Sequence, residues 1–384
     1  GMTKKKTLSS TRSYATVAPQ ELTNENIELT REFVHSLPKT DLHVHLDGSM
    51  RLDTILELAE ERGVKLPADD RDGLAKAIHM GELCESLTDY LTAFDVTLSV
   101  LQDTPALYRA AYELAEDAAA ENVRYMEVRY APNLHTGKGL PLTHILEAVL
   151  EGLNDARADF GIDTNVIVCG IRHIEPQMSL RLAELAVAYK NKGVVGFDLA
   201  GAEYKYPAKD HREAFYLIRN NNVNCTIHAG EAYGPESIHQ AIHVCGAHRI
   251  GHGVRLREDG DLLNYVNDQR IPIEVCLRSN LQTRAVTSYE AHPLRLYFDL
   301  GIRVTINTDN RLVTDTTMTD ELWRAIEVAD FNGGELRQLL INGFKSAFMP
   351  FHERQAMLRR VVRELDEAFS AEAERQKKAK IQVA

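Results

Sequence analysis

Short apolar, β-branched runs recur along this 384-residue chain, and a longer amphipathic stretch follows each of them. Such runs indicate buried parallel strands, and the stretches between them have the apolar period of helices, as in Ala106–Glu121, Leu180–Lys190 and Leu262–Gln269. We count eight runs: Asp41–Leu46, Val123–Tyr130, Asn165–Ile171, Val194–Leu199, Asn224–His228, His248–His252, Pro272–Leu277 and Arg303–Asn307. Eight strands can close a barrel, whereas a doubly wound sheet more often has about five or six. The alternation therefore predicts an α/β fold, a (β/α)8 TIM barrel.

The domain organisation follows from what separates the runs. Residues 1–25 are polar and without periodicity, so we expect a flexible N-terminal arm. Residues 26–384 contain no linker-like stretch, which predicts a single barrel domain that ends in a C-terminal helix. About 75 residues separate the first two runs, too many for one crossover helix. We expect extra helices there, one over Asp89–Gln102, that add a packing layer or form an apolar lid over the barrel mouth.

Charge and composition exclude several classes of partner. The chain has 44 Lys and Arg against 56 Asp and Glu, a net charge of −12, which argues against nucleic acid or an anionic membrane as its main partner. We find neither a signal peptide nor an apolar stretch near the roughly 20 residues of a transmembrane helix. Five cysteines without a CxxC pair suit a reducing compartment. The sequence predicts a soluble, cytoplasmic protein and does not determine its oligomeric state.

Residues with metal-binding or acid–base chemistry lie at the ends of four runs. In the first, His43 and His45 are two residues apart, so both side chains leave an extended strand on the same face. The other three runs end in, or next to, His228 and Glu231, His252, and Asp309. Each motif alone would also fit a buried histidine whose hydrogen bonds are satisfied, or a residue that caps the next helix. Because barrels gather their catalytic groups at the C-terminal ends of strands, the coincidence of all four indicates one shared site.

The residue types in this set favour metal-assisted hydrolysis. Three imidazoles and one carboxylate can hold a borderline-soft ion such as Zn²⁺ and leave a position for water. Such an ion lowers the pKa of bound water to about 7, which makes hydroxide available at neutral pH. Glu231 and His252 suit proton transfer and orientation of that hydroxide. The set predicts a hydrolytic enzyme with one Zn²⁺ per chain.

Seven sequence blocks, in one order and at plausible separations, resemble the adenosine deaminase family over residues 38 to about 350. They are HVHLDG (43–48), VRYMEVRYAP (123–132), VVGFDLAG (194–201), HAGE (228–231), RIGHG (249–253), EVCLRSN (274–280) and VTINTDN (304–310). The resemblance implies a zinc-dependent enzyme that deaminates adenosine and 2′-deoxyadenosine to the 6-oxo nucleosides and ammonia. Its partner would be a small-molecule purine nucleoside, attacked by hydroxide at C6.

The resemblance also implies a role for each catalytic residue. The implied zinc ligands are His43, His45, His228 and Asp309. Glu231 would protonate purine N1, His252 would hold the attacking hydroxide, and Asp309 would accept the proton of the water. A dry apolar pocket would raise the pKa of Glu231, so this carboxyl would meet the substrate in its protonated form.

The implied substrate contacts are His45, Asp47, Gly201 and Asn310. Asp47 would reach the ribose 5′-hydroxyl, and the Gly201 backbone N–H would meet purine N3. Asn310 replaces a second Asp that is common in the family, and its amide can donate to purine N7 without the protonation that an Asp needs. Ala202 replaces an acid, and we expect little effect from this change; Leu277 replaces a proline, and we expect it only to loosen a loop.

Four alternatives compete with this interpretation. The main rival substrate is another 6-aminopurine, such as adenine or a modified adenosine. In the family, however, an Asp at the position of Asp47 is found in enzymes that act on nucleosides, and a Glu is found in adenine deaminases. Hydrolases of esters, lactones or phosphoesters on this barrel commonly use two metals bridged by a carboxylated Lys, and no predicted strand ends in Lys. A non-catalytic binding protein would not need the complete set of metal-ligand and acid–base residues. The other zinc deaminase pattern requires P-C-x-x-C after H-x-E; His173-Ile-Glu175 matches its first half, but the sequence contains no P-C-x-x-C.

Overall fold

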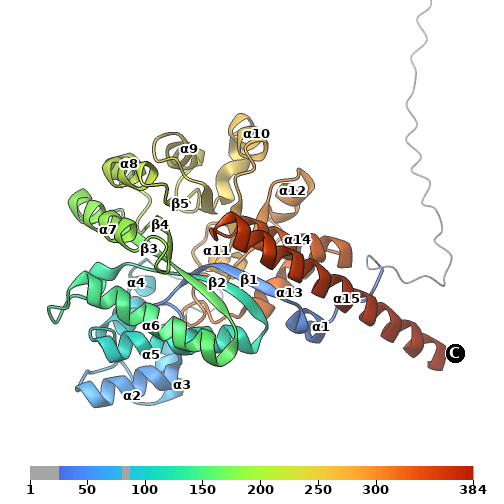
Figure 1. Ribbon diagram of the computed structural model, residues 1–384, viewed down its shortest axis with the longest axis horizontal. Helices are drawn as coiled ribbons and strands as arrows, with labels where there is room; N and C mark the ends of the chain where they lie inside the picture. The colour runs from blue at the N-terminus through green and yellow to red at the C-terminus, as the bar shows by residue number, and fades with distance from the viewer. Residues whose placement is uncertain (1–25, 80–86, 384) are drawn as a thin grey trace, which may run out of the picture.

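Eight parallel strands follow one another in chain order around a barrel (Figure 1). The protein is described by a computed structural model that covers residues 26–79 and 87–383. Each predicted run overlaps one strand, so the predicted TIM barrel is confirmed. The strands are β1 (Lys39–His45), β2 (Val123–Tyr130), β3 (Asp163–Ile171), β4 (Val194–Ala200), β5 (Asn224–Ala229), β6 (Arg249–His252), β7 (Ile273–Val275) and β8 (Val304–Ile306). The arm predicted over residues 1–25 lies outside the described residues.

Helices surround the barrel and fill the long gap after β1. The gap holds α2 (Leu52–Arg62), α3 (Arg71–Ile78), α4 (Leu87–Val100) and α5 (Thr104–Ala120). The remaining α-helices are α1 (Arg31–Ser36), α6 (Leu142–Phe160), α7 (Pro176–Ala188), α8 (Arg212–Asn220), α9 (Pro235–His243), α10 (Gly260–Asp268), α11 (Leu277–Gln282), α12 (Leu294–Asp299), α13 (Met318–Ala329), α14 (Gly333–Ser346) and α15 (Phe351–Val383). The described residues also form three 3₁₀ turns: η1 (Pro132–His135), η2 (Ala208–His211) and η3 (Val254–Glu258).

The helix predicted over Asp89–Gln102 corresponds to α4, which is followed by a segment anchored at the carboxyl end of β2. There Gln102 Nε2 donates to the carbonyl of Leu134 at 3.0 Å, and His135 Nδ1 lies 2.7 Å from the carbonyl of Leu101. These contacts attach the end of α4 to η1, on the side of the barrel where the strands end. The role of α4 as a lid stays a prediction.

The barrel closes between its first and last strands through a short backbone link. Asp309 pairs with Val44 in an isolated parallel bridge beyond the end of β8. The Asp309 N–H donates to the carbonyl of His43 at 2.8 Å, and the His45 N–H donates to the carbonyl of Asp309 at 2.8 Å. Residues predicted as site residues therefore form the seam of the barrel itself.

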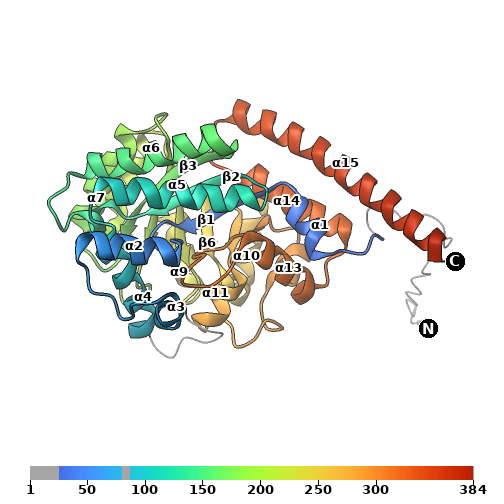
Figure 2. The same cartoon turned by 90° about the horizontal axis from the view of Figure 1, so that it is seen from below.

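The long helix α15 packs on the barrel with its first half and extends past the body with its second (Figure 2). Its buried apolar side chains recur every four residues, at Met357, Val361, Leu365 and Phe369. Beyond them, Gln376 accepts the Glu28 N–H at 2.9 Å and donates to the Glu28 carbonyl at 2.8 Å. Among the described helices, none combines the length and the hydropathy needed to cross a bilayer.

Close packing of α5 on α6 depends on Gly152. A Cβ at this position would overlap the carbonyl oxygen of Tyr108 and lie 3.2 Å from Cβ of Ala111. Because backbone atoms cannot move aside cheaply, we expect Gly152→Ala to lower the free energy of unfolding by about 1–3 kcal/mol, measured by urea or thermal unfolding.

The matched control is Gly260→Ala at the start of α10, where no atom of the described residues lies within 4 Å of the added Cβ. This substitution should leave stability unchanged or raise it by up to about 1 kcal/mol. Equal changes in the two variants would contradict the steric explanation.

Candidate metal centre and active site

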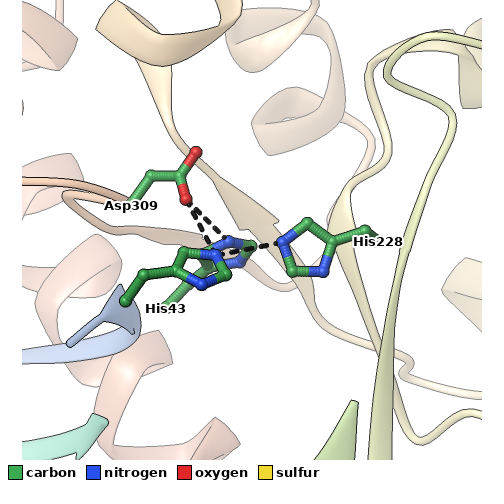
Figure 3. A group of neighbouring side chains, drawn as sticks. His43, His228 and Asp309 are labelled. Carbon is green, nitrogen blue, oxygen red and sulfur yellow. Dashed lines mark hydrogen bonds and ion pairs between the residues drawn. The ribbon is translucent and has the colours of Figure 1, made fainter. Parts of the chain in front are cut away.

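Three imidazoles and one carboxylate converge at the carboxyl end of the barrel (Figure 3). They come from β1, from β5 and from the segment after β8, and are His43, His45, His228 and Asp309. Their ligand atoms all lie within 4.8 Å of one another. Asp309 Oδ1 is 3.2 Å from both His43 Nε2 and His45 Nε2, and His45 Nε2 is 3.3 Å from His228 Nε2. The structure thus brings together the four residues that the resemblance implies as ligands.

Buried carboxylates orient two of these rings. His43 Nδ1 lies 2.9 Å from Glu274 Oε1, and His228 Nδ1 lies 3.0 Å from Asp198 Oδ2. An imidazole that donates its Nδ1–H to a carboxylate presents the lone pair of Nε2 on its other side. His43 Nε2 is buried and makes no hydrogen bond to any of the described residues. Both rings therefore aim an acceptor atom at the common centre.

The donor set fits a zinc ion. Lone pairs and a carboxylate oxygen at separations of 3.2–3.3 Å repel one another unless a cation lies among them. Separations of this size would let the four atoms bind one ion of the size of zinc. The site has the nitrogen and oxygen donors and the spacing that zinc prefers.

A buried ionic network lies beneath the ligands. Arg129 donates to Asp198 at 3.2 Å and to Glu274 at 3.1 Å. Arg249 donates to Glu274 at 2.6 Å and to Glu127 at 2.7 Å, and so connects these two carboxylates. Burial alone would raise the pKa of Glu274, but the two guanidinium groups hold that pKa well below its ordinary value. His228 and Arg129 likewise lower the pKa of Asp198 against the effect of burial. Both carboxylates are thus ionised acceptors for the ligand histidines.

Sequence reasoning assigned no role to this network, although its members stand in the quoted blocks. The available signal was a charged residue inside a strand predicted to be buried, as at Arg129 in β2, Asp198 in β4 and Glu274 in β7. All three side chains are fully buried. A buried charge of this kind needs a partner, which indicates a contact across the barrel interior.

Glu231 and His252 lie next to each other beside Asp309. His252 Nε2 is 2.8 Å from Glu231 Oε2 and 3.8 Å from Asp309 Oδ2. Two hydroxyls support the carboxylates, because Ser279 Oγ donates to Asp309 Oδ2 at 2.8 Å and Thr283 Oγ1 lies 3.0 Å from Glu231 Oε1. The predicted acid–base groups therefore face the same centre as the four ligands.

The expectation of a raised pKa for Glu231 is wrong for this structure. Burial would raise it, but the contact with His252 outweighs burial and lowers the pKa of Glu231 below its ordinary value. A dry, apolar pocket was the only surrounding that the sequence indicated. The neighbouring imidazole comes from the next strand, β6, whose parallel pairing with β5 places His252 opposite Ala229, two residues before the carboxyl.

Backbone strain accompanies these side chains. His252 has φ of +71° and Asp309 has φ of +65°, a region that residues other than glycine seldom adopt. Such conformations cost about 1–3 kcal/mol and occur most often at functional sites. Gly251, before His252, leaves room for the ring of His43, since a Cβ there would lie 3.2 Å from Cε1 of that ring.

The residues implied in substrate binding line the same end of the barrel. Asp47 is buried after β1, and Gly201 follows β4 with φ of +92°. Asn310 is buried beside Asp309 and packs against Gly48, where an added Cβ would overlap its Oδ1 atom. Their contacts with a purine stay predictions.

Glu203 is a further residue that sequence reasoning missed. Its carboxylate accepts three consecutive backbone N–H groups, from Gly230 at 2.9 Å, Glu231 at 3.2 Å and Ala232 at 3.0 Å. It therefore fixes the turn that carries Glu231 and attaches that turn to the loop of Gly201. An acid two residues after Gly201 was the signal in the sequence.

The comparison with known families agrees with this geometry. A family model described as adenosine deaminase matches residues 38–364, which include every site residue named above. The chain belongs to the adenosine deaminase family. The family match extends past the last predicted block and into α15.

Relatives in this family are similar along most of the chain. An adenosine deaminase from Mycolicibacterium vanbaalenii is 46% identical over 352 residues, which cover 87% of this chain and 97% of the relative. A probable adenosine deaminase from Dictyostelium discoideum is 45% identical over 324 residues, which cover 84% of this chain but only 42% of that longer protein.

Solved structures share the barrel over nearly its whole length. An amidohydrolase from Burkholderia ambifaria with bound zinc is 26% identical, with a TM-score of 0.82 over 91% of this chain and 96% of the other. An adenine deaminase from Arthrobacter aurescens is 26% identical, with a TM-score of 0.80 over 86% and 100%. An N6-mAMP deaminase from Arabidopsis is 28% identical, with a TM-score of 0.77 over 88% and 99%.

Proposed function

We propose that this chain is a zinc-dependent hydrolase that deaminates adenosine and 2′-deoxyadenosine, yielding inosine or 2′-deoxyinosine and ammonia. The observation that carries the proposal is the convergence of four ligand atoms within 4.8 Å, with Glu231 and His252 directly beside them. Full-length similarity to a relative named adenosine deaminase supports the choice of substrate.

His43, His45, His228 and Asp309 are the residues that would hold the zinc ion. When bound, zinc lowers the pKa of a coordinated water to about 7 and so supplies hydroxide at neutral pH. Glu274 and Asp198 keep the rings of His43 and His228 in the ligating tautomer and increase their basicity.

The two oxygens of Asp309 have separate surroundings, which suits two tasks. Oδ1 faces His43 and His45, whereas Oδ2 accepts the Ser279 hydroxyl and faces His252. Oδ2 is placed to accept the proton of the attacking water. His252 donates a hydrogen bond that orients the attacking oxygen toward C6.

Glu231 delivers a proton to purine N1. Protonation draws electron density from the ring, so C6 becomes a better target, and the tetrahedral carbon then loses ammonia to give the 6-oxo purine. Before substrate binds, Glu231 instead contacts His252 at 2.8 Å. A purine that excludes water from the carboxyl raises its pKa and favours the protonated form.

Four residues would orient the nucleoside, each by one polar group: His45, Asp47, Gly201 and Asn310. Asp47 accepts the ribose 5′-hydroxyl, and the Gly201 N–H meets N3. The Asn310 amide donates to N7 in its neutral state, so this contact does not depend on pH.

The proposed contact between Asp47 and the ribose 5′-hydroxyl predicts an order of substrates. We expect adenosine and 2′-deoxyadenosine to have kcat/KM values within about tenfold of each other, and adenine and AMP to be at least about 10²-fold poorer, because each leaves buried Asp47 without its hydroxyl partner. Ammonia release from each compound measures the order. Turnover of adenine without turnover of adenosine would exclude the nucleoside assignment and favour an adenine deaminase.

We also place this activity in the cytoplasm, with no nucleic-acid or membrane partner. The four cysteines among the described residues are free and buried, and the net charge of −12 disfavours polyanionic partners. Both observations support a small-molecule enzyme of a reducing compartment.

A further inference from the structure

A chain of three hydrogen bonds leads from the backbone at the start of α12 to the ring of His252. The Leu294 N–H lies 3.0 Å from His292 Nδ1, and His292 Nε2 lies 3.0 Å from Asn280 Oδ1. The Asn280 side-chain nitrogen then lies 3.0 Å from His252 Nδ1. His292, Asn280 and His252 are all buried.

The direction of every bond in this chain follows from its first member. A backbone N–H can only donate, so His292 Nδ1 must accept from Leu294. A neutral imidazole has one N–H, which for His292 is therefore on Nε2, and the group that it meets on Asn280 must be the amide oxygen. Burial, together with the charge of Arg257, lowers the pKa of His292 to about 3, which keeps this ring neutral.

The orientation of the Asn280 amide then determines the tautomer of His252. With its oxygen turned toward His292, the amide presents its NH₂ group to His252 Nδ1, which must accept. The proton of His252 is thereby assigned to Nε2. Burial lowers the pKa of His252, whereas Glu231 and Asp309 raise it. The Asn280 NH₂ group opposes a second ring proton, because an N–H on Nδ1 would face this donor and have no acceptor.

We propose that Asn280 and His292 are positioning residues that hold His252 as an Nε2–H donor toward the reacting centre. Nε2 is the ring atom that lies 2.8 Å from Glu231 Oε2 and 3.8 Å from Asp309 Oδ2. Because this nitrogen already has its proton, His252 orients the attacking oxygen and does not deprotonate it. Proton acceptance falls to Asp309. The catalytic part of the proposal rests on the deaminase function, whereas the tautomer does not.

The tautomer is measured directly in the zinc-loaded full chain. Nitrogen NMR of ¹⁵N-histidine-labelled protein distinguishes protonated from unprotonated ring nitrogens, and a His252→Gln variant identifies the signals of this residue. We expect Nε2 protonated and Nδ1 unprotonated at neutral pH. The opposite tautomer, or a doubly protonated ring, would overturn the proposal whether or not adenosine is a substrate.

Asn280→Asp tests the catalytic consequence with an isosteric change. A carboxylate accepts from Nδ1 and so draws the proton to the wrong side of His252. We expect kcat for adenosine to fall on the order of 10²–10⁴-fold, with KM within about threefold of the wild-type value and zinc content retained. The NMR signals of His252 should show a protonated Nδ1 in this variant.

The matched control is Asn342→Asp, a buried asparagine on α14 that donates to the carbonyl of Val304 at 3.2 Å and does not contact His252. It imposes the general cost of a buried carboxylate, and we expect its kcat to stay within about threefold of wild type. A wild-type kcat in Asn280→Asp, or equal losses in both variants, would overturn the positioning role. An inactive wild type would refute the deaminase proposal alone, since the NMR result stands without substrate.

Discussion

The substitution Glu231→Gln should reduce kcat for adenosine on the order of 10²–10⁴-fold while zinc content and substrate affinity stay near wild type. The amide has the shape of the carboxyl but cannot transfer a proton to purine N1. It still occupies the position 2.8 Å from His252 Nε2 and within reach of Thr283. Steady-state kinetics with metal analysis of the same preparation measures both parts of the expectation.

Glu236→Gln is the control for this variant. Glu236 stands in the first turn of α9, is exposed and lies in the same connection after β5. Its kcat should match the wild-type value within about twofold. If Glu231→Gln also kept its kcat, the assignment of Glu231 as proton donor would be wrong.

Replacing His43 with Ala should remove the metal and, with it, nearly all turnover. His43 supplies one of the four ligand atoms, and its Nε2 has no alternative hydrogen-bond partner among the described residues. Zinc should stabilise the wild type against unfolding by about 2.7 kcal/mol at a free concentration 100 times its dissociation constant, and this stabilisation should be absent in the variant. Metal analysis after dialysis and thermal unfolding with and without zinc are the measurements.

Comparison of Glu274→Gln with His43→Ala separates the orientation of a zinc ligand from the presence of that ligand. Glu274→Gln keeps His43 but weakens the acceptor of its Nδ1–H, so zinc affinity should fall by about 10–100-fold without being lost. His239→Ala, an exposed histidine on α9, should bind zinc as the wild type does. Full zinc occupancy in His43→Ala would exclude this residue from the ligand set.

The sequence predicts those parts of the site that depend on local periodicity. Alternation along one strand places His43 and His45 on a common face, and the apolar runs locate all eight strands. The convergence of β1, β5 and the segment after β8 follows from barrel closure, because parallel strands present their carboxyl ends at one rim. For these features a local pattern together with one topological rule is enough.

Other parts depend on contacts between strands whose pairing no local pattern encodes. Arg129 meets Asp198 and Glu274 only because the three side chains project into the same barrel interior. The contact of Glu231 with His252, which reverses the expected pKa shift, depends on the register in which β5 pairs with β6. The His292–Asn280 bond joins residues 12 apart in sequence through an irregular loop, where side-chain direction cannot be inferred from period.

The seam between Val44 and Asp309 has a consequence for how metal loading and folding are connected. A cation bound by His43, His45 and Asp309 would link the first strand of the barrel to the segment that follows the last strand. Without the cation, mutually repelling lone pairs would remain at this joint, which the bridge and hydrogen bonds such as that from the Leu42 N–H to Asn307 hold together. Zinc binding should therefore stabilise this joint, so the metal-free chain should exchange the Asp309 and His45 amide hydrogens faster than the zinc-bound chain.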